Sequence, residues 1–308
     1  MIWPFAASTL GAIHEDLPTL ARMLPEHGAS LVELRTAPDA PVHVGLTGTE
    51  RAQVRRLFTD AGVQILAVAS RVRIAQAGED ETVTESLTAH LNLAADLGAR
   101  FVRLFPGAPT ATAATDELPA LHDAEEAASA VVRRLAACLD AAEATGVRIV
   151  LETHDSHPRG QDIAALLQRL SETVGDHTVG AIWDVLHPWR VGEDLTTTAR
   201  ALLPYLIDGR GYVQIKDVPS RADKTPVLQG SGAIPLAPFL DLLTDGGYTG
   251  PVSLEWERHW YPDVPTLAQA LAAASAALAE STPTPTQTVR TRSVKPADPV
   301  STTKGWKR

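Results

Sequence analysis

Two hydrophobic patterns alternate along this chain, one with the period of a strand and one with the period of a helix. Short runs rich in β-branched residues predict buried strands, and the longer stretches between them carry apolar residues at helical spacing. In residues 124–144, for example, Val131, Leu135 and Cys138 fall on one helical face. Helices are predicted over 50–59, 124–144 and 162–170. Strands are predicted over 2–7, 30–34, 64–69, 101–105, 148–154, 179–184, 212–217 and 252–257.

The order of these elements predicts an α/β fold, the (β/α)8 TIM barrel. Each of the eight predicted strands is followed by a helical stretch, and this alternation is typical of parallel strands joined by helical crossovers. Eight such units in about 280 residues fit a closed barrel. An open doubly wound sheet is the alternative, but no GxGxxG fingerprint follows the first strand.

The last segment differs in composition and divides the chain into two regions. Residues 1–280 form the predicted barrel, a catalytic domain, whereas residues 281–308 are rich in Pro, Thr and Ser and show no apolar period. This segment carries six Lys and Arg against one Asp. Such a composition predicts a disordered basic tail. The alternative is an arm that lies on an acidic neighbouring subunit.

The overall composition narrows the function classes. The hydrophobic fraction of 44% and the charged fraction of 21% are typical of a globular protein, and the net charge of −10 argues against a nucleic-acid surface. Cys138 is the single cysteine, so no intrachain disulfide can form. The N-terminus lacks the basic region of a signal peptide, and no run approaches the roughly 18 apolar residues of a membrane helix. We therefore expect a cytoplasmic protein that binds neither nucleic acid nor membrane.

Polar side chains end four successive predicted strands, at the end of a barrel that usually carries the chemistry. These residues are Glu152, Asp184, Gln214 and Glu255. Because side chains alternate along a strand, all four can point into the barrel toward one place. Three carboxylates that converge would repel one another and would be costly to desolvate, and a divalent cation removes that cost. The pattern therefore predicts a metal site with these four ligands.

The ligand types favour particular metals. Oxygen ligands without a thiolate favour Mg or Mn. His154 and His187 lie close enough in the sequence to add nitrogen, which leaves Co, Fe and Zn open. The alternative is that the acids form salt bridges at the rim with Lys216, Arg103 and Arg35. Four polar strand ends in succession favour the metal, because barrel interiors are ordinarily filled by Val, Ile and Leu.

Several further residues near the strand ends are candidates for substrate binding. His187 would orient a substrate hydroxyl or cap its loop. Lys216 would stabilise negative charge on an intermediate, or it would pair with Glu257 or Asp217. Arg221, in a loop over the top face, suits an anionic or polyhydroxylated substrate, or it is merely solvated. The full set of substrate-binding candidates is His154, His187, Lys216, Arg221 and Glu257.

Other charged and aromatic residues near the strand ends are assigned to supporting positions. We expect Glu33, Arg35 and Arg103 to form an ion-pair network. The aromatic residues are interpreted as core, with a wall against a sugar face as the alternative. They are Trp3, Phe105, Trp183, Trp189, Trp256 and Trp260.

Five motifs carry a resemblance to a known family. They are LETH at 151–154, WDVLHP at 183–188, VQIKDVPSR at 213–221, GSGAIP at 230–235 and GPVSLEWE at 250–257. Their order and spacing resemble the xylose isomerase-like TIM-barrel superfamily over roughly residues 1–275. That superfamily contains sugar isomerases, ketose 3-epimerases, inosose dehydratases and endonuclease IV.

The resemblance implies roles for individual residues. It implies that Glu152, Asp184 and Glu255 are metal ligands and that His187 contacts substrate. Many relatives place a His where this chain has Gln214, but hydroxypyruvate isomerase-like members also have a Gln there, followed by a loop similar to the one with Arg221. The acidity of the chain and its few strand-end histidines separate it from the DNA-binding endonucleases. Family habit suggests a homodimer or a homotetramer.

Three functions are compatible with these residues. The first is a metal-dependent isomerase or epimerase that acts on a small α-hydroxycarbonyl compound, a ketose-like sugar or polyol, through an enediolate. One of Glu152 and Glu255 would remove a proton, and the other would return one. The second is an inosose-type dehydratase on the same scaffold. The third is a barrel that binds a sugar or cyclitol without catalysis.

Overall fold

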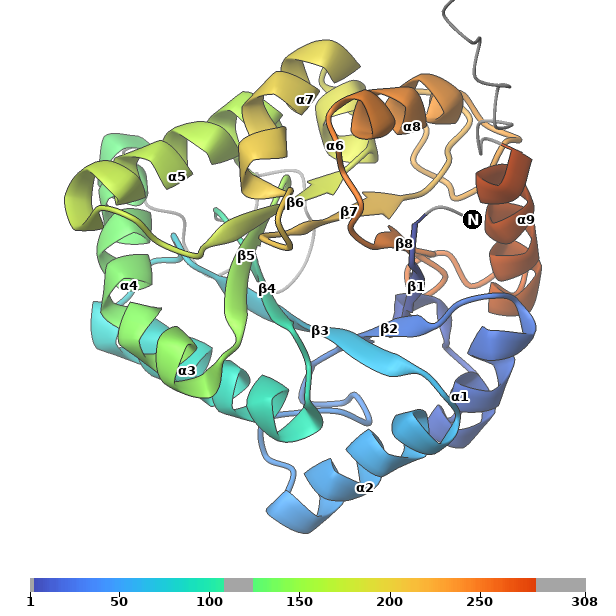
Figure 1. The fold of residues 1–308 in the computed structure, drawn as a ribbon, viewed down its shortest axis with the longest axis horizontal. Helices are drawn as coiled ribbons and strands as arrows, with labels where there is room; N and C mark the ends of the chain where they lie inside the picture. The colour runs from blue at the N-terminus through green and yellow to red at the C-terminus, as the bar shows by residue number, and fades with distance from the viewer. Residues whose placement is uncertain (1–2, 108–123, 281–308) are drawn as a thin grey trace, which may run out of the picture.

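Eight parallel strands form a closed barrel, surrounded by helices (Figure 1). The computed structural model describes residues 3–107 and 124–280. The strands follow one another around the barrel in chain order, and β8 pairs with β1 to close it. This closure confirms the predicted TIM barrel and excludes the open sheet. The tail predicted for 281–308 and the start of the first predicted strand lie outside the described residues.

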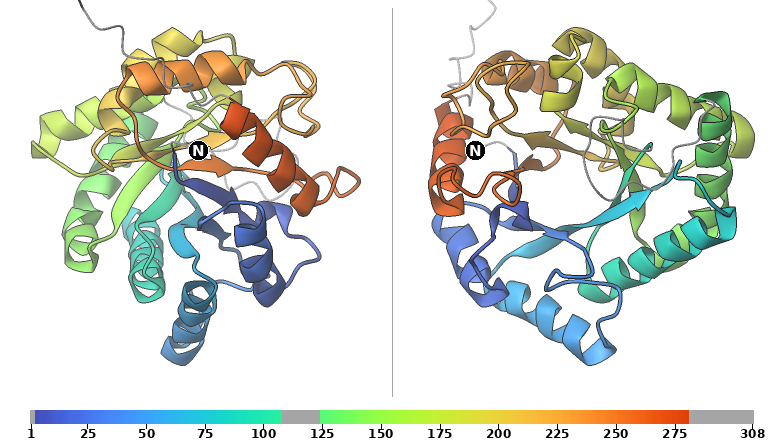
Figure 2. Two further views of the ribbon diagram at one scale, coloured as in Figure 1. Left: turned by 45° about the vertical axis from the view of Figure 1, so that its right-hand side comes forward. Right: turned by 180° about the vertical axis from the view of Figure 1, so that it is seen from behind.

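The strands and helices alternate along the chain, and Figure 2 shows the helices on the outside from two further directions. Between β6 and β7 there are two helices and a short 3-10 turn, so that crossover is longer than the single helical stretch predicted. The strands are β1 Phe5–Ser8, β2 Leu31–Arg35, β3 Gln64–Arg73, β4 Phe101–Phe105, β5 Arg148–Glu152, β6 Gly180–Asp184, β7 Tyr212–Ile215 and β8 Val252–Leu254. The helices are η1 Thr9–Gly11, α1 Leu17–Glu26, α2 Gly48–Asp60, α3 Asp80–Leu97, α4 Ala124–Thr145, α5 Gly160–Val174, α6 Leu186–Arg190, α7 Leu195–Leu202, η2 Leu203–Tyr205, α8 Leu236–Asp245 and α9 Leu267–Glu280.

The ends of the helices follow from local side-chain chemistry. At the start of α2, the Thr47 hydroxyl accepts a hydrogen bond from the Glu50 amide, and the Glu50 carboxylate accepts one from the Thr47 amide. At the end of α3, Gly98 takes a left-handed conformation with φ 74°, which costs a glycine little. These polar signals delimit the predicted helices to within a few residues.

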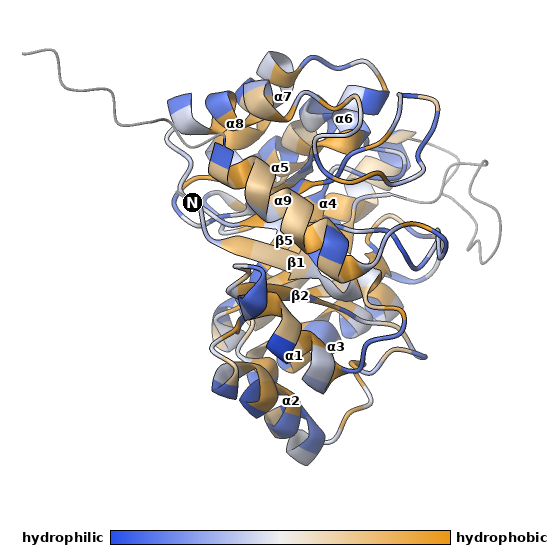
Figure 3. Ribbon diagram, turned by 90° about the vertical axis from the view of Figure 1, so that its right-hand side faces the viewer, coloured by the Kyte–Doolittle hydropathy of each residue, from blue (hydrophilic) through white to orange (hydrophobic). Residues whose placement is uncertain are grey.

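Two hydrophobic cores hold the barrel together. A small inner core closes the barrel interior, and a much larger outer core lies between the strands and the helices. In Figure 3, β1 is hydrophobic, whereas α1 and α2 alternate hydrophobic and hydrophilic residues, as expected for helices with one face on a sheet. The inner core consists of Ala6, Leu31, Leu66, Ala67, Phe101, Val150, Ile182 and Tyr212.

Several strands end earlier than predicted. β5 ends at Glu152, β7 at Ile215 and β8 at Leu254. The polar residues that follow them stand at the rim, where the amides of Thr153 and Glu255 still donate hydrogen bonds to the neighbouring strands. By contrast, β3 runs to Arg73, and its register with β4 shifts between Ala69 and Arg73. This irregularity carries β3 beyond the predicted end at residue 69.

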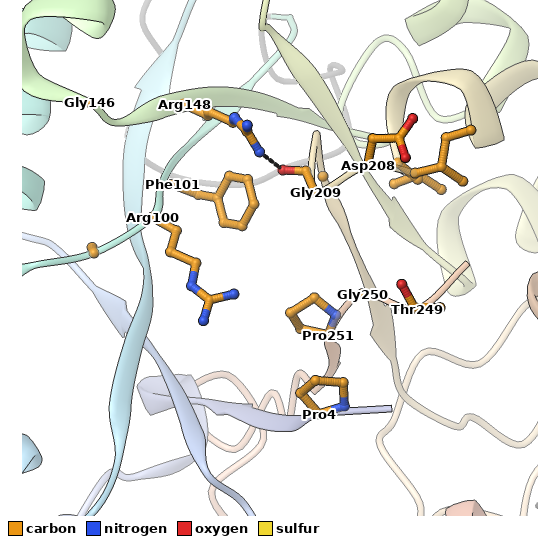
Figure 4. A pocket seen from close by; sticks show the side chains of 14 residues that line it. Pro4, Arg100, Phe101, Gly146, Arg148, Asp208, Gly209, Thr249, Gly250 and Pro251 are labelled. Carbon is orange, nitrogen blue, oxygen red and sulfur yellow. Dashed lines mark hydrogen bonds between the residues drawn. The ribbon is translucent and has the colours of Figure 1, made fainter. Parts of the chain in front are cut away.

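The opposite end of the barrel holds a hollow of about 440 Å³, shown in Figure 4. Phe101 lines it, together with Pro4 and Pro251 at the starts of their strands. Arg148 donates a hydrogen bond to the Gly209 carbonyl at this end. The hollow therefore lies among the strand starts, away from the strand ends that carry the predicted site. Within residues 3–107 and 124–280, no helix has the length and apolar character needed to cross a bilayer.

Candidate active site

Three carboxylates converge at the C-terminal ends of β5, β6 and β8. Glu152, Asp184 and Glu255 each offer an oxygen atom, and these atoms all lie within 4.8 Å of one another. Each of the three side chains is buried. The structure thus brings together three of the four residues predicted as metal ligands. Such a group needs positive charge close by, because like charges in a low-dielectric interior repel strongly.

Lys216 supplies part of that positive charge. Its Nζ lies 2.8 Å from Asp184 Oδ2 and 2.7 Å from Glu257 Oε1, and it also pairs with Glu255. Burial alone would lower the pKa of Lys216, but the charges of Asp184, Glu255 and Glu257 raise it well above its usual value. Lys216 is therefore a buried ammonium shared by three carboxylates. Of the two partners predicted for Lys216, only Glu257 is observed.

Asp217 fixes a loop instead of pairing with the lysine. Its Oδ1 accepts hydrogen bonds from the amides of Val218 and Ile234, and its Oδ2 accepts from the amides of Gly230 and Gly232. Hydrogen bonds that a carboxylate accepts are about twice as strong as hydrogen bonds between neutral groups. The single carboxylate thereby ties together both ends of the segment that leads from β7 to α8.

Arg103 supplies the second positive charge. Its Nη1 lies 2.5 Å from Glu152 Oε2, and its guanidinium stacks on Phe105 with Cζ 4.1 Å from the ring centroid. Burial raises the pKa of Glu152, and the charge of Arg103 opposes that rise. The expected ion pair of Arg103 with a site carboxylate is present. Within the described residues, the buried Glu152 Oε1 has no hydrogen-bond partner.

The other two carboxylates of the group differ in their acidity. Burial raises the pKa of Asp184 to about 7, with the charges of Glu255 and Glu152 adding to the rise and Lys216 opposing it. For Glu255, burial also favours the neutral acid, but Lys216 and Arg103 together lower the pKa below its usual value. Both carboxylates are buried, but their pKa values shift in opposite directions because their positive partners differ.

Gln214 is the register partner of Asp184 on the neighbouring strand. Its Nε2 lies 3.2 Å from Glu33 Oε2, which also accepts a hydrogen bond of 2.9 Å from the Tyr212 hydroxyl. Burial, followed by the charge of Glu255, raises the pKa of Glu33 to about 7. Because its amide nitrogen faces Glu33, the carbonyl oxygen of Gln214 is left as the free end, and it has no partner among the described residues. Glu33 accordingly orients Gln214 and, in the part of the chain that the structure describes, does not form the expected ion pair.

Two histidines form the edge of the site. The rings of His154 and His187 lie 4.5 Å apart, and both can offer a nitrogen within 4.8 Å of a Glu152 oxygen. Burial lowers the pKa of His187 well below its usual value, and the charge of His154 lowers it further. For His154, burial acts in the same direction, but the hydrogen bond to Asp155 raises the pKa above its usual value.

His187 does not cap its loop in the described residues. The Leu186 amide at the start of α6 donates to Asp184 Oδ1 at 2.8 Å, so the aspartate makes that contact. His187 Nε2 is buried, has no hydrogen-bond partner among residues 3–107 and 124–280, and lies 3.6 Å from Asp184 Oδ2. The geometry therefore favours the alternative in which this nitrogen faces the site.

Arg221 lies on the surface of the site loop. Its side chain is exposed, and its Cζ is 5.2 Å from the centroid of the Trp189 ring. The core interpretation of the aromatic residues holds for Trp183 and Trp256, which are almost completely buried, whereas Trp260 is 57% exposed. Trp3 and Trp189 are also buried.

Arg35 departs from the expected ion-pair network, and Arg71 and Arg73 lie in a part of β3 that was not predicted as strand. Arg35 was expected to pair with an acid, and it forms no ion pair with a carboxylate of the described residues. Arg73 pairs with Asp155 through a 3.2 Å contact, and neither residue was predicted as part of the site. Arg71 lies in the same stretch of β3, beyond the predicted strand end. The alternation Ser-Arg-Val-Arg at 70–73 was the available signal, but the strand was predicted to end at residue 69.

Comparisons with known proteins place this geometry in a family. The model of the xylose isomerase-like TIM barrel family matches residues 21–280. The chain therefore belongs to the xylose isomerase-like TIM barrel family, as the sequence motifs indicated. A comparison with curated proteins found no significant match.

Solved structures show the same fold at low sequence identity. D-psicose 3-epimerase from Clostridium cellulolyticum H10, solved with D-tagatose, is 14% identical with a TM-score of 0.68, covering 90% of this chain and 98% of that one. The 3-keto-D-glucoside 4-epimerase from E. coli is 16% identical with a TM-score of 0.67, covering 91% and 100%. The IolI protein, solved with a zinc atom, is 18% identical with a TM-score of 0.67, covering 89% and 96%.

Proposed function

We propose that this protein is a metal-dependent sugar isomerase or epimerase that acts on a small α-hydroxycarbonyl substrate. The observation that carries the proposal is the convergence of three buried carboxylates, Glu152, Asp184 and Glu255, within 4.8 Å of one another at the strand ends. This is the end of the barrel at which enzymes of this fold carry their active sites. The neighbours in fold, two epimerases and a zinc-bound protein, support the same class.

The donor set fits a divalent cation. Glu152 Oε1 and Gln214 Oε1 are buried and lack a hydrogen-bond partner in the described residues, so both oxygens are available as ligands. Asp184 and Glu255 complete a set of four oxygen donors, which Mg and Mn prefer. His154 and His187 stand beside Glu152 and could add nitrogen for Co, Fe or Zn.

When bound, the cation would act as a Lewis acid on the substrate carbonyl and its adjacent hydroxyl. Glu152 and Glu255 would then exchange the proton, one carboxylate removing it and the other returning it. Lys216 lies among Asp184, Glu255 and Glu257 and would stabilise negative charge on a substrate oxygen. His187 and Glu257 would orient hydroxyl groups, with His154 and Arg221 as further contacts.

The direct test is solvent proton exchange in the variant Glu152→Gln. We expect the variant to fold and to lose deuterium incorporation into substrate by about 10²-fold or more, because general base catalysis is worth about that much. Candidate ketoses would be incubated with the full chain and Mn²⁺ in D2O, and NMR would follow the exchange. Glu26→Gln, an exposed glutamate at the end of α1, is the matched control and should leave exchange unchanged.

The outcomes of this experiment separate the alternatives. Exchange at the normal rate in the Glu152→Gln protein would contradict the proposed role. A product that has lost water would indicate an inosose-type dehydratase. A protein that gains no thermal stability from Mg²⁺, Mn²⁺ or Zn²⁺ would favour a sugar- or cyclitol-binding barrel without catalysis, since a ligand bound only by the folded state must stabilise it. Homodimer or homotetramer assembly and a cytoplasmic location stay predictions.

A further inference from the structure

Two arginines lie on the neighbouring strands β2 and β3 at the mouth of the barrel, whereas the carboxylates lie at the ends of β5, β6 and β8. Arg35 ends β2, and its register partner on β3 is Ala69, two residues before Arg71. Arg35 is half-buried and Arg71 is exposed. The two strands thus deliver two guanidinium groups to one part of the rim.

The two positive charges are close enough to act on each other. Burial lowers the pKa of Arg35, the charge of Arg71 lowers it further, and only Asp39 opposes them. The neighbouring His259 shows the same field, because burial and then the charge of Arg35 lower its pKa. Two adjacent like charges are unfavourable unless an anion lies between them.

No carboxylate of the described residues forms an ion pair with either arginine. The neighbouring arginines of the same region are different, since Arg73 pairs with Asp155 and Arg103 pairs with Glu152. Among the described residues, Arg35 and Arg71 are therefore the rim arginines of β2 and β3 without an ion pair, which leaves their hydrogen-bond donors for a ligand. A guanidinium matches the geometry of a carboxylate or a phosphate with two parallel hydrogen bonds.

A cavity adjoins this pair. It has a volume of about 420 Å³ and includes Arg71 in its wall, with the segment Thr36–Pro38 that directly follows Arg35. Ser86 and His90 of α3 form another part of the wall, and His90 Nδ1 lies 2.7 Å from the Ser86 carbonyl oxygen. That size falls within the range of sites for small molecules.

We propose that Arg35, Arg71 and the adjoining cavity form a subsite for an anionic group, a phosphate or a carboxylate, at one end of the substrate. The inference rests on the proposed function for the other end of the molecule, which the carboxylate group of β5, β6 and β8 would hold. The substrate class is then an α-hydroxycarbonyl compound with a terminal anionic group. Its negative end lies on the arginine side, and its hydroxycarbonyl end lies on the carboxylate side.

The test is anion binding by the chelator-treated full chain, measured by calorimetry, with inorganic phosphate in one arm and acetate in the other. Chelation removes divalent cations, so that neither anion can bind through a metal ion. We expect saturable binding of at least one anion, weakened about tenfold by Arg71→Gln and by Arg35→Gln, because hydrogen bonds to charged groups are worth that much. Arg56→Gln, an exposed arginine of α2, is the matched control and should bind normally.

The two arms identify the anionic group, since a phosphate site prefers phosphate and a carboxylate site binds acetate as well. Absence of binding in both arms, or equal weakening by Arg56→Gln, would overturn the subsite. Thermal unfolding of each variant shows whether a loss of binding is a loss of fold. Anion binding that depends on Arg35 and Arg71 in a protein without isomerase or epimerase activity would leave the subsite standing and refute the proposed function.

Discussion

The two sides of the barrel mouth carry opposite charges and treat them differently. On the side of β5 to β8, the carboxylates of Glu152, Asp184 and Glu255 are buried, and each has a positive partner in Arg103 or Lys216. On the side of β2 and β3, Arg35 and Arg71 are half-buried or exposed and have no carboxylate partner in the described residues. A buried charge needs an opposite charge within the protein, whereas an exposed charge is stabilised by water and stays available to a ligand.

Under the two proposals above, this difference would let one ring of strand ends bind a polar molecule in a single direction. A cation-binding group and an anion-binding group on different strands would hold a substrate by both ends, and reversal would place like charges together. The polarity of the site would then follow from which strands carry the carboxylates and which carry the arginines.

The largest expected effect comes from removing the ammonium of Lys216. In chelator-treated protein, Lys216→Gln leaves the buried Asp184 and Glu255 and the half-buried Glu257 without that partner, and we expect a loss of about 3–5 kcal/mol in the free energy of unfolding. Mn²⁺ should restore stability, with an affinity about tenfold higher than in the unaltered protein, because a competing positive charge is gone. Urea unfolding with and without Mn²⁺ measures both.

Lys224→Gln is the matched control for that variant, since Lys224 is an exposed lysine in the loop after β7. It should change neither stability nor Mn²⁺ affinity appreciably. A Lys216→Gln protein as stable as the unaltered one, with no gain from Mn²⁺, would show that the carboxylate side does not depend on this compensation.

A smaller effect concerns Glu33. Burial raises the pKa of this residue from 4.5 to about 7. The folded state therefore holds the proton more tightly than the unfolded state, so this contribution to stability is full below about pH 4.5 and is lost as the pH rises through 7. We expect about 2.5 kcal/mol less stability from Glu33 at about pH 8 than at about pH 5 in chelator-treated protein. Glu33→Gln should remove that difference in urea unfolding, and an unchanged pH dependence would place the titration elsewhere.

The smallest expected effect is that of replacing Arg35, which has no described ion pair, in contrast to Arg103, which pairs with Glu152. Arg35→Gln should change the free energy of unfolding by less than about 0.5 kcal/mol, because the residue has no described ion pair to lose. The same substitution at Arg103 should cost about 3 kcal/mol, because it leaves Glu152 buried and unpaired. Thermal or urea unfolding of the two variants side by side measures the difference. Equal costs would remove the contrast between the two sides of the mouth.

The sequence predicts the barrel and much of the site for one physical reason. Periodicity reveals which side chains face inward, and strand ends reveal where polar ones gather, so the amino-acid pattern suffices to bring Glu152, Asp184 and Glu255 together. Pairing of long side chains is different, because it depends on their rotamers. The sequence offered Lys216 as a salt-bridge partner of the strand-end acids and of Glu257, but spacing could not show that three carboxylates share one ammonium, nor that Asp217 accepts hydrogen bonds from four amides.

The arginine side was harder to predict because it depends on an irregularity. The register shift in β3 between Ala69 and Arg73 extends that strand past its expected end and brings Arg71 to the rim. Nothing in the period of the hydrophobic residues signals such a shift. The expectation that Arg35 joins an ion-pair network failed for a related reason, since it assumed that every charge at the rim has a partner.

The anchoring of the loop after β7 has a consequence for how such proteins diversify. Asp217 holds the amides of Gly230, Gly232 and Ile234, so the entry and exit of the loop are fixed by one side chain at the strand end. The stretch 219–226 lies between these anchors, with the Val227 amide also bonded to the Asp217 carbonyl oxygen, so we expect it to accept changes of residue or length while its attachment points stay where they are. Substitutions in this loop, including at Arg221, would then leave the barrel strands unchanged.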